Sequence, residues 1–126
     1  MLQPEEIKIA LRNGGLMQDD LFACGEKSGG KIMTFLQLAA GIPNTRLFGF
    51  TITDGKLIIT PAGNKSVLIN KAVFIKRDDV KKLDFRIDVF GDGILTIKYN
   101  NGKNKRYRFG KPFDEINKIV EAFNHS

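Results

Sequence analysis

The sequence predicts a mainly β fold with flanking helices. Apolar and polar residues alternate along 83–109, and two glycine-containing segments, 91–93 and 101–102, interrupt the alternation. A period of two places the apolar side chains on one face of each strand. Glycine and asparagine supply the positive φ angles that tight hairpins need. This stretch is therefore expected to form a three-stranded antiparallel meander. The buried row of its first strand is predicted to be Leu83, Phe85, Ile87 and Val89.

Two amphipathic helices are predicted beside the strands. The helix at 112–124 follows the meander directly, and Pro112 suits its first turn. Its apolar residues recur at helical spacing and share one face, namely Phe113, Ile116, Ile119, Val120 and Phe123. A shorter helix at 4–13 has acidic residues at its positive end and belongs to an N-terminal appendage at 1–16. Its buried stripe is predicted to be Ile7, Ala10 and Leu11.

The remaining strands are predicted between these helices. Residues 21–24 form the first strand, followed by a polar loop at 25–30. Residues 47–61 alternate around Asp54-Gly55 and form a hairpin. Two short strands are expected at 66–69 and 72–75, around Asn70-Lys71. With the meander, these segments give about seven strands.

An apolar insert at 31–42 does not fit the strand pattern. As a helix it has one narrow polar stripe, and such a helix must be covered by protein or lipid; a strand is the weaker alternative. The open choices for what covers it are a second copy, a protein partner, an anionic membrane surface, or the open side of the sheet. Self-association needs the fewest extra molecules and is favoured. The candidate apolar interface is Ile32, Met33, Phe35, Leu36 and Leu38.

Three segments resemble the bacterial branch of the pleckstrin-homology-like (PH-like) domain family. They are FGFTITDGKLIIT (48–60), VFIKRDDVKKLDF (73–85) and YRFGKPFDEINKIVEAF (107–123). The resemblance implies a single domain over 1–126, with an antiparallel barrel of about seven strands capped by the C-terminal helix. The insert at 31–42 departs from the family pattern. In that fold, members bind phosphoinositides, bind peptides or assemble, so the resemblance implies binding or assembly.

Positive charge is concentrated in the second half of the chain. The net charge is +6; residues 1–63 carry six basic and six acidic residues, whereas 64–126 carry 14 and 8. If Ile97 lies opposite Tyr107, then Lys98 lies opposite Arg106 and Arg86 extends the same row. Such a row favours an anionic partner, although Asp84 and Asp88 dilute it and a solvated face is the alternative. The candidate anion-binding or partner-binding residues are Arg86, Lys98, Lys103, Lys105, Arg106 and Arg108.

The sequence contains no recognisable catalytic or metal-binding constellation. Cys24 is the only cysteine and His125 the only histidine, so neither has a partner of its kind for metal or nucleophilic chemistry. Residues 25–31 match the phosphate-binding pattern G-x-x-x-x-G-K, but Ile32 stands where Ser or Thr should bind magnesium. We therefore expect no cofactor and no enzymatic activity.

These observations favour a non-enzymatic binding or assembly module whose ligand is an anionic surface or a protein. A nucleic-acid-binding protein is the alternative, because Tyr99, Tyr107 and Phe109 accompany the basic residues. The alternation turns these rings inward, however, so tight binding of single strands is not expected. The first residues do not have the pattern of a secretory leader, and no apolar run reaches about 20 residues, so a cytoplasmic location is expected.

Overall fold

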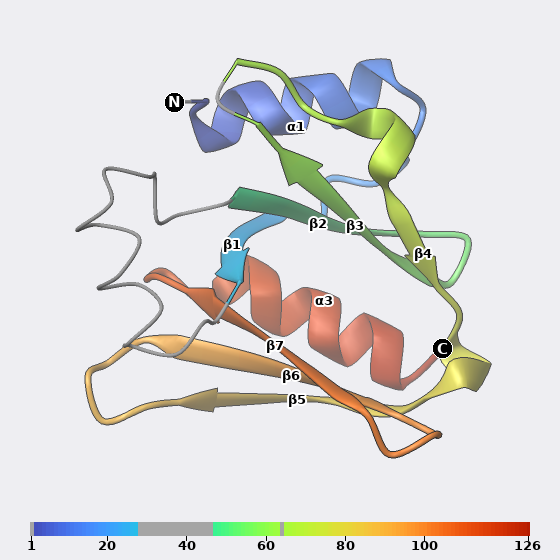
Figure 1. Ribbon diagram of the computed structural model, residues 1–126, viewed down its shortest axis with the longest axis vertical. Helices are drawn as coiled ribbons and strands as arrows, with labels where there is room; N and C mark the ends of the chain where they lie inside the picture. Colours follow the sequence, from blue (N-terminus) through green and yellow to red (C-terminus); the bar gives the residue numbers. More distant parts are fainter. Residues whose placement is uncertain (1, 28–46, 64) are drawn as a thin grey trace.

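The computed structural model describes residues 2–27, 47–63 and 65–126. Within them, seven antiparallel strands form one sheet with two α-helices (Figure 1). The helices are α1 (Pro4–Asn13) and α3 (Asp114–Asn124). The strands are β1 (Ala23–Lys27), β2 (Leu47–Thr53), β3 (Lys56–Ala62), β4 (Val73–Ile75), β5 (Val80–Ile87), β6 (Gly93–Tyr99) and β7 (Asn104–Phe109). The predicted mainly β fold with flanking helices is confirmed.

The strands follow the spatial order β4-β3-β2-β1-β7-β6-β5. The two edge strands, β4 and β5, do not pair with each other, so the sheet is open where the sequence predicted a barrel. The sheet bends so that its two halves face each other, and α3 lies between them (Figure 1). Among the described residues, no helix is long and apolar enough to span a membrane.

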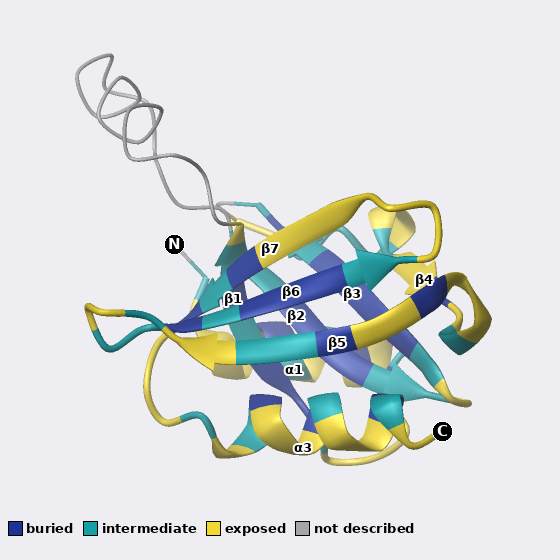
Figure 2. Cartoon of the chain, turned by 90° about the horizontal axis from the view of Figure 1, so that it is seen from below, coloured by how far each residue is buried: buried dark blue, intermediate teal, exposed yellow. Residues whose placement is uncertain are grey.

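The main core lies on the inner face of the bent sheet, where α3 packs. Ile116, Ile119 and Phe123 of this helix are at most 2% exposed, which confirms three of the five residues of the predicted buried face. Val120 is only partly buried, and Phe113, also partly buried, precedes the helix, which begins at Asp114. The ring of Phe50 packs edge-on against the ring of Tyr107, with centroids 5.0 Å apart. Each large apolar side chain buried here contributes about 1.5–3 kcal/mol. The core therefore ties both halves of the sheet to α3 (Figure 2).

A second core lies on the opposite, outer face of the sheet, beneath α1. Ile7 and Leu11 of this helix are fully buried, while Ala10 is only half-buried. A Cβ atom at Gly49 of β2 would lie 3.0 Å from both Ile7 and Leu11, so the absence of a side chain lets the helix approach the strand. The hydroxyl of Thr51 donates to the carbonyl oxygen of Leu21 at 2.7 Å and fixes the segment before β1 on β2. The outer face of this half is thus covered.

The first strand lies two residues later than predicted. It begins at Ala23 and includes residues 25–27, which the sequence placed in a loop. A Cβ atom on Gly25 would lie 2.7 Å from the ring of Phe109, so glycine here marks a close approach between β1 and β7. The glycines after residue 24 therefore do not all indicate a loop.

The hairpin predicted at 47–61 is confirmed, whereas the strand predicted at 66–69 is wrong. Asp54 and Gly55 both have positive φ, 54° and 74°, as a two-residue hairpin turn requires. Val67 makes only a single bridge to Ala62, and the chain then turns through the short 3-10 helix η1 (Ile69–Lys71). The strand predicted at 72–75 is present as β4.

The meander is confirmed, but the register between β6 and β7 differs from the prediction by two residues. Leu95 lies opposite Tyr107, and Ile97 lies opposite Lys105. The turn sets this register, because the Tyr99 amide donates to the Lys103 carbonyl at 2.9 Å and Gly102 takes a φ of 87°. A shift of two preserves which face each side chain occupies and changes only which residues lie opposite each other.

The buried row predicted for the first meander strand ends at Phe85. Ile87 is 60% exposed and Val89 is 94% exposed. The strand stops because the Asp88 side chain accepts hydrogen bonds from the amides of Phe90 (2.9 Å) and Asp92 (3.0 Å) and starts the turn. The predicted burial of Ile87 and Val89 is therefore wrong.

A basic sheet face as the candidate functional site

The outer face of β5, β6 and β7 carries the candidate site. Because Leu83, Leu95 and Tyr107 point inward and are buried, the alternate residues point outward. No helix among the described residues lies over this face, which Figure 2 shows from the front. Its outward-facing residues are Lys82, Asp84, Arg86, Ile94, Thr96, Lys98, Asn104, Arg106 and Arg108. This set contains five cations and one carboxylate.

The register arranges these residues in three rows across the strands. The first row is Lys82, Lys98 and Asn104; the second is Asp84, Thr96 and Arg106; the third is Arg86, Ile94 and Arg108. Asp84 accepts ion pairs from two rows, with its Oδ2 atom 3.2 Å from Arg86 Nε and 3.7 Å from Lys98 Nζ. The Asp84 carboxylate therefore pairs with two cations.

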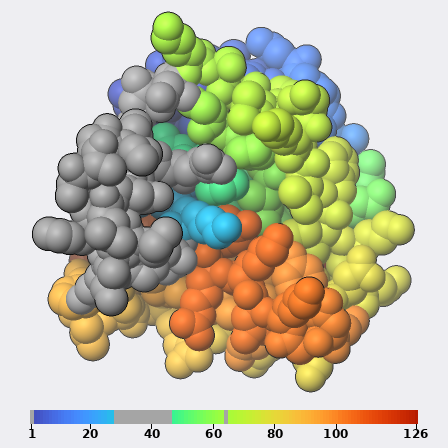
Figure 3. All heavy atoms as spheres, viewed as in Figure 1, coloured from blue at the N-terminus to red at the C-terminus, as the bar shows by residue number. Residues whose placement is uncertain are grey.

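The two ends of this face differ in charge balance. At one end, Arg108 lies 3.5 Å from Asp92 and 3.9 Å from Asp88, and Glu26 of β1 lies opposite it. Away from this end, Lys82 in the first row and Arg106 in the second have no ion pair with any described residue. We call Lys82, Lys98, Lys103 and Arg106 the basic patch. Figure 3 shows the side chains of β7 and of the β6–β7 turn, coloured orange, at the molecular surface.

Direct cross-strand pairing makes the basic patch electrostatically unfavourable in isolation. Lys82 lies directly opposite Lys98, and like charges in that position destabilise a sheet by a few tenths of a kcal/mol. Lys98 lies 3.7 Å from Asp84, whereas Lys82 makes no ion pair with a described carboxylate. A bound anion at this end would remove the repulsion.

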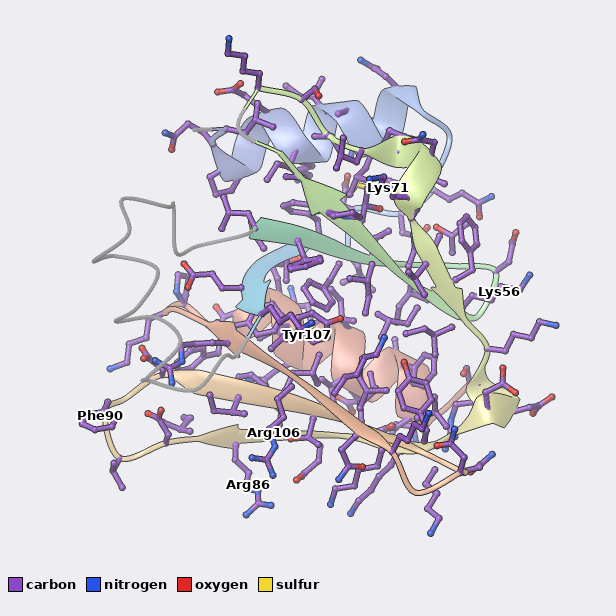
Figure 4. All side chains as sticks on the ribbon, in the orientation of Figure 1. Lys56, Lys71, Arg86, Phe90, Arg106 and Tyr107 are labelled. Atoms are coloured by element: carbon purple, nitrogen blue, oxygen red, sulfur yellow. The ribbon has the colours of Figure 1, made fainter. Side chains whose placement is uncertain are left out.

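The structure brings four of the six predicted basic site residues to one face. Arg86, Lys98, Arg106 and Arg108 all point outward, and in Figure 4 Arg86 and Arg106 extend away from the sheet while Tyr107 points into the core. The predicted row of Arg86, Lys98 and Arg106 does not form, because the register shift places Arg106 opposite Thr96.

Of the other two predicted residues, Lys103 belongs to the basic patch but lies in a turn, Lys105 lies outside the patch, and one member of the patch was missed. Lys105 follows Asn104 in the strand and shares a row with Ile97, so it belongs to the inner side at the end of the sheet. Lys103 lies in the β6–β7 turn. Lys82 was not predicted, although it precedes Asp84 by two residues and the alternation alone places it on the outer face.

The predicted apolar interface belongs to a part of the chain that the structure does not describe. Ile32, Met33, Phe35, Leu36 and Leu38 lie outside the described residues.

The ionisable and nucleophilic groups in the described part of the chain include the thiol of Cys24. Burial, and secondarily the charge of Glu26, raise the pKa of the Cys24 thiol from 9.0 to about 11, so the thiol stays protonated near neutral pH. Among the described residues, no three His, Cys, Asp or Glu side chains converge as a metal site. A shallow hollow of about 350 Å³ between α1 and Glu115 is lined mainly by charged side chains, including the ion-paired Arg12 and Asp20.

Comparison of the chain with protein-family models, with curated proteins and with solved structures gave no match.

Proposed function

We propose that the chain is a non-enzymatic binding module of PH-like fold that binds an anionic partner through its basic patch. The observation that carries this proposal is the uncovered outer face of β5–β7, on which Lys82 and Arg106 have no ion pair with a described residue. In the described part of the chain, α3 covers the inner face of the sheet and α1 covers the outer face of the other half.

The arrangement of elements supports the PH-like assignment. The sheet has seven antiparallel strands, the meander β5–β7 is followed directly by a helix, and that helix fills the space between the two halves of the sheet. These are the features that the resemblance of 48–60, 73–85 and 107–123 implies. The open seam between β4 and β5 is the point at which the sheet departs from a closed barrel.

The state of Cys24 supports a role without covalent catalysis. A nucleophilic cysteine needs a thiolate, which a lowered pKa provides. Here the pKa is raised to about 11, by burial first and by Glu26 second. The most reactive side chain type in the described residues is therefore held in its unreactive form.

The magnitude expected for patch binding is modest. A basic residue close to an anionic membrane surface contributes about 1 kcal/mol. The four residues of the basic patch would together provide roughly 4 kcal/mol, which corresponds to a millimolar dissociation constant. Binding of this kind weakens steeply as salt rises, because exposed charges are screened.

Vesicle sedimentation tests the proposal with matched charge variants. The double variant Lys82→Glu/Arg106→Glu should lose binding to phosphatidylserine-containing vesicles at low salt, because it reverses both cations that lack an ion pair. The control Lys65→Glu/Lys71→Glu makes the same change in net charge on exposed residues outside the patch and should retain most of the binding. Equal loss in both variants would show that only net charge matters and would contradict the proposal.

Nucleic acid is the second candidate ligand, and the same charge variants test whether it binds to the basic patch. Single-strand binding proteins stack bases on exposed aromatic rings, but Tyr107 and Phe109 are 7% and 2% exposed. The predicted inward orientation is borne out by the burial of these two rings, while the third ring of the prediction, Tyr99, is half-buried. We expect no submicromolar binding of a single-stranded oligonucleotide at physiological salt. Submicromolar binding that the patch variant abolishes would replace the membrane-surface proposal.

A further inference from the structure

β5 is an edge strand of the sheet, and its hydrogen-bonding pattern shows which of its backbone groups point away from β6. The Asp88 amide donates to the Asp92 carbonyl at 2.8 Å, which closes the ladder between β5 and β6. Because hydrogen-bonded pairs alternate along antiparallel strands, Lys82, Asp84 and Arg86 direct their backbone groups toward β6. Leu83, Phe85 and Ile87 therefore direct theirs toward the free edge.

At Leu83 the free edge is already occupied by a side chain. The Asn124 side-chain amide, at the end of α3, donates to the Leu83 carbonyl at 2.9 Å and accepts from the Leu83 backbone amide at 2.9 Å. This pair of bonds reproduces what one residue of an adjacent strand would make. Asn124 therefore blocks strand addition at Leu83 only.

No described strand pairs with the neighbouring edge positions. The backbone groups of Phe85 and Ile87 have no hydrogen-bond partner among the described residues beyond the strand itself. The ring of Phe85 packs inward against Phe113, with centroids 5.6 Å apart, while Ile87 is 60% exposed. Unprotected edges of this kind accept another strand. Figure 2 shows β5 at the border of the sheet, on the side facing α3.

We propose that this edge pairs with the same edge of a second copy, antiparallel and about a twofold axis at Phe85. In that register, Phe85 faces Phe85 of the second copy and Ile87 faces its Leu83. On the outer face, each Asp84 lies opposite an Arg86 and each Lys82 lies opposite an Asp88. All four outward cross-strand pairs are thus of opposite charge. This inference does not depend on the proposed anionic ligand.

The register shifted by two, centred on Arg86, is excluded by charge. It would place Arg86 opposite Arg86 and Asp84 opposite Asp88, and like charges directly opposite destabilise a pair of strands. Four outward residues alternate in charge along β5 and the turn after it, namely Lys82, Asp84, Arg86 and Asp88. Each of them lies opposite a member of this set with the opposite charge only when the axis passes through Phe85. The pairing joins the outer faces of the two meanders into one continuous surface.

Asn124 limits the strength of this pairing. With Leu83 occupied, the Phe85 pair contributes two backbone hydrogen bonds, and the pairs between Leu83 and Ile87 form only when the Asn124 amide leaves the edge. The dimer is accordingly expected to be weak in the wild type, and tighter when the side chain is removed.

Charge swaps test the register by sedimentation equilibrium. Asp84→Arg alone places an arginine opposite Arg86 of the second copy, and Arg86→Asp alone places an aspartate opposite its Asp84; each variant should dimerise more weakly than the wild type. An equimolar mixture of the two restores opposite charges, and its heterodimer should form at least about tenfold more tightly than either homodimer. High salt should reduce this preference.

A double charge swap and the removal of the Asn124 side chain complete the test. Asp84→Arg/Arg86→Asp should dimerise as the wild type does. Asn124→Ala should tighten the dimer and slow hydrogen exchange of the Leu83 and Phe85 amides with rising protein concentration, whereas the control Asn117→Ala, on the exposed side of α3, should do neither. A wild type and Asn124→Ala that both stay monomeric at the highest soluble concentration would overturn the proposal. A mixture no tighter than its components would do the same.

Discussion

Cys24 shows how position in the sheet sets the chemistry of one side chain. It lies in β1 and packs against the second core beneath α1. Loss of solvent disfavours the thiolate, and the nearby charge of Glu26 disfavours it further, which together raise the pKa of Cys24 to about 11. The protonated thiol is thus the form that the folded state stabilises.

This shift predicts a pH-dependent contribution to stability. Because the folded-state pKa lies above the unfolded value near 9.0, the contribution is fully present below pH 9 and is lost as pH rises toward about 11. The difference in the free energy of unfolding between the wild type and Cys24→Ala should therefore decrease across this pH range. Urea unfolding of both proteins at several pH values measures it. The comparison also separates Cys24 from Tyr99 and Tyr107, whose pKa values burial likewise raises. A difference that is constant with pH would contradict the assignment.

Lys105 and Arg106 show what residue-level patterns can and cannot predict. Both belong to a run of basic residues, and counting charge along the sequence places both in one site. Neighbours in a strand point to opposite faces, so only Arg106 joins the basic patch. The alternation alone assigns the faces of these two residues, as it does that of Tyr107, whereas local charge density does not.

At the scale of elements, Arg77 connects the end of α3 to the start of β5. It lies in the short 3-10 helix η2 (Arg77–Asp79) and donates to the Val80 carbonyl at 2.6 Å and to the Asn124 carbonyl at 3.5 Å. Its guanidinium also lies over the ring of Phe123, 5.6 Å from the centroid. A cation at this position is favoured by the negative end of the helix dipole.

Replacement of Arg77 should weaken this connection. Arg77→Met keeps much of the apolar stem and removes the charge, so it should lower the free energy of unfolding by about 1–2 kcal/mol. Lys118→Met is the matched control, since Lys118 makes only an exposed ion pair with Glu115 at 3.5 Å and should change stability by less than about 0.5 kcal/mol. Chemical denaturation measures both. Equal effects would show that Arg77 does not anchor the helix.

Two of the errors in element prediction have identifiable physical causes. The alternation in β6 and β7 repeats every two residues, so it cannot distinguish registers that differ by two; the positive φ of Gly102 and the bond from Tyr99 to Lys103 decide between them. At β1, Gly25 suggested a loop because glycine is frequent there. In the structure it permits contact with Phe109, a partner that is distant in the sequence.

At the scale of the whole molecule, the placement of two helices determines which surface is available. α3 takes the inner face of the sheet and α1 takes the outer face of β1–β3, which leaves the outer face of β5–β7 uncovered by described residues. Amphipathic spacing predicted that both helices bury one side. It could not predict which side of the sheet each would cover, because that depends on contacts such as those of Gly49 with Ile7 and Leu11.

Pairing of two copies would also affect binding to a surface. One basic patch would provide about 4 kcal/mol by the reasoning above, and in the proposed dimer two patches on one continuous sheet face would contact a membrane together. The second contact would then be intramolecular, and the overall affinity would rise without any new type of contact. The two proposals are separable, since Arg106 lies on β7, two strands away from the paired edge, so Arg106→Glu alone should change surface binding and not dimerisation. Asn124→Ala acts on the edge of β5 and should change dimerisation without changing the charge of the basic patch.

The most direct test of the central claim is a residue-resolved map of the bound surface. Amide resonances of the isotope-labelled protein can be followed by NMR during titration with phosphatidylserine-containing nanodiscs at low salt. The predicted result is that the perturbed amides cluster at Lys82, Thr96, Lys98, Lys103 and Arg106, and that they recover at high salt. Perturbations confined to α1 and the hollow beside Glu115, or the absence of any perturbation, would contradict the assignment of the basic patch as the binding site.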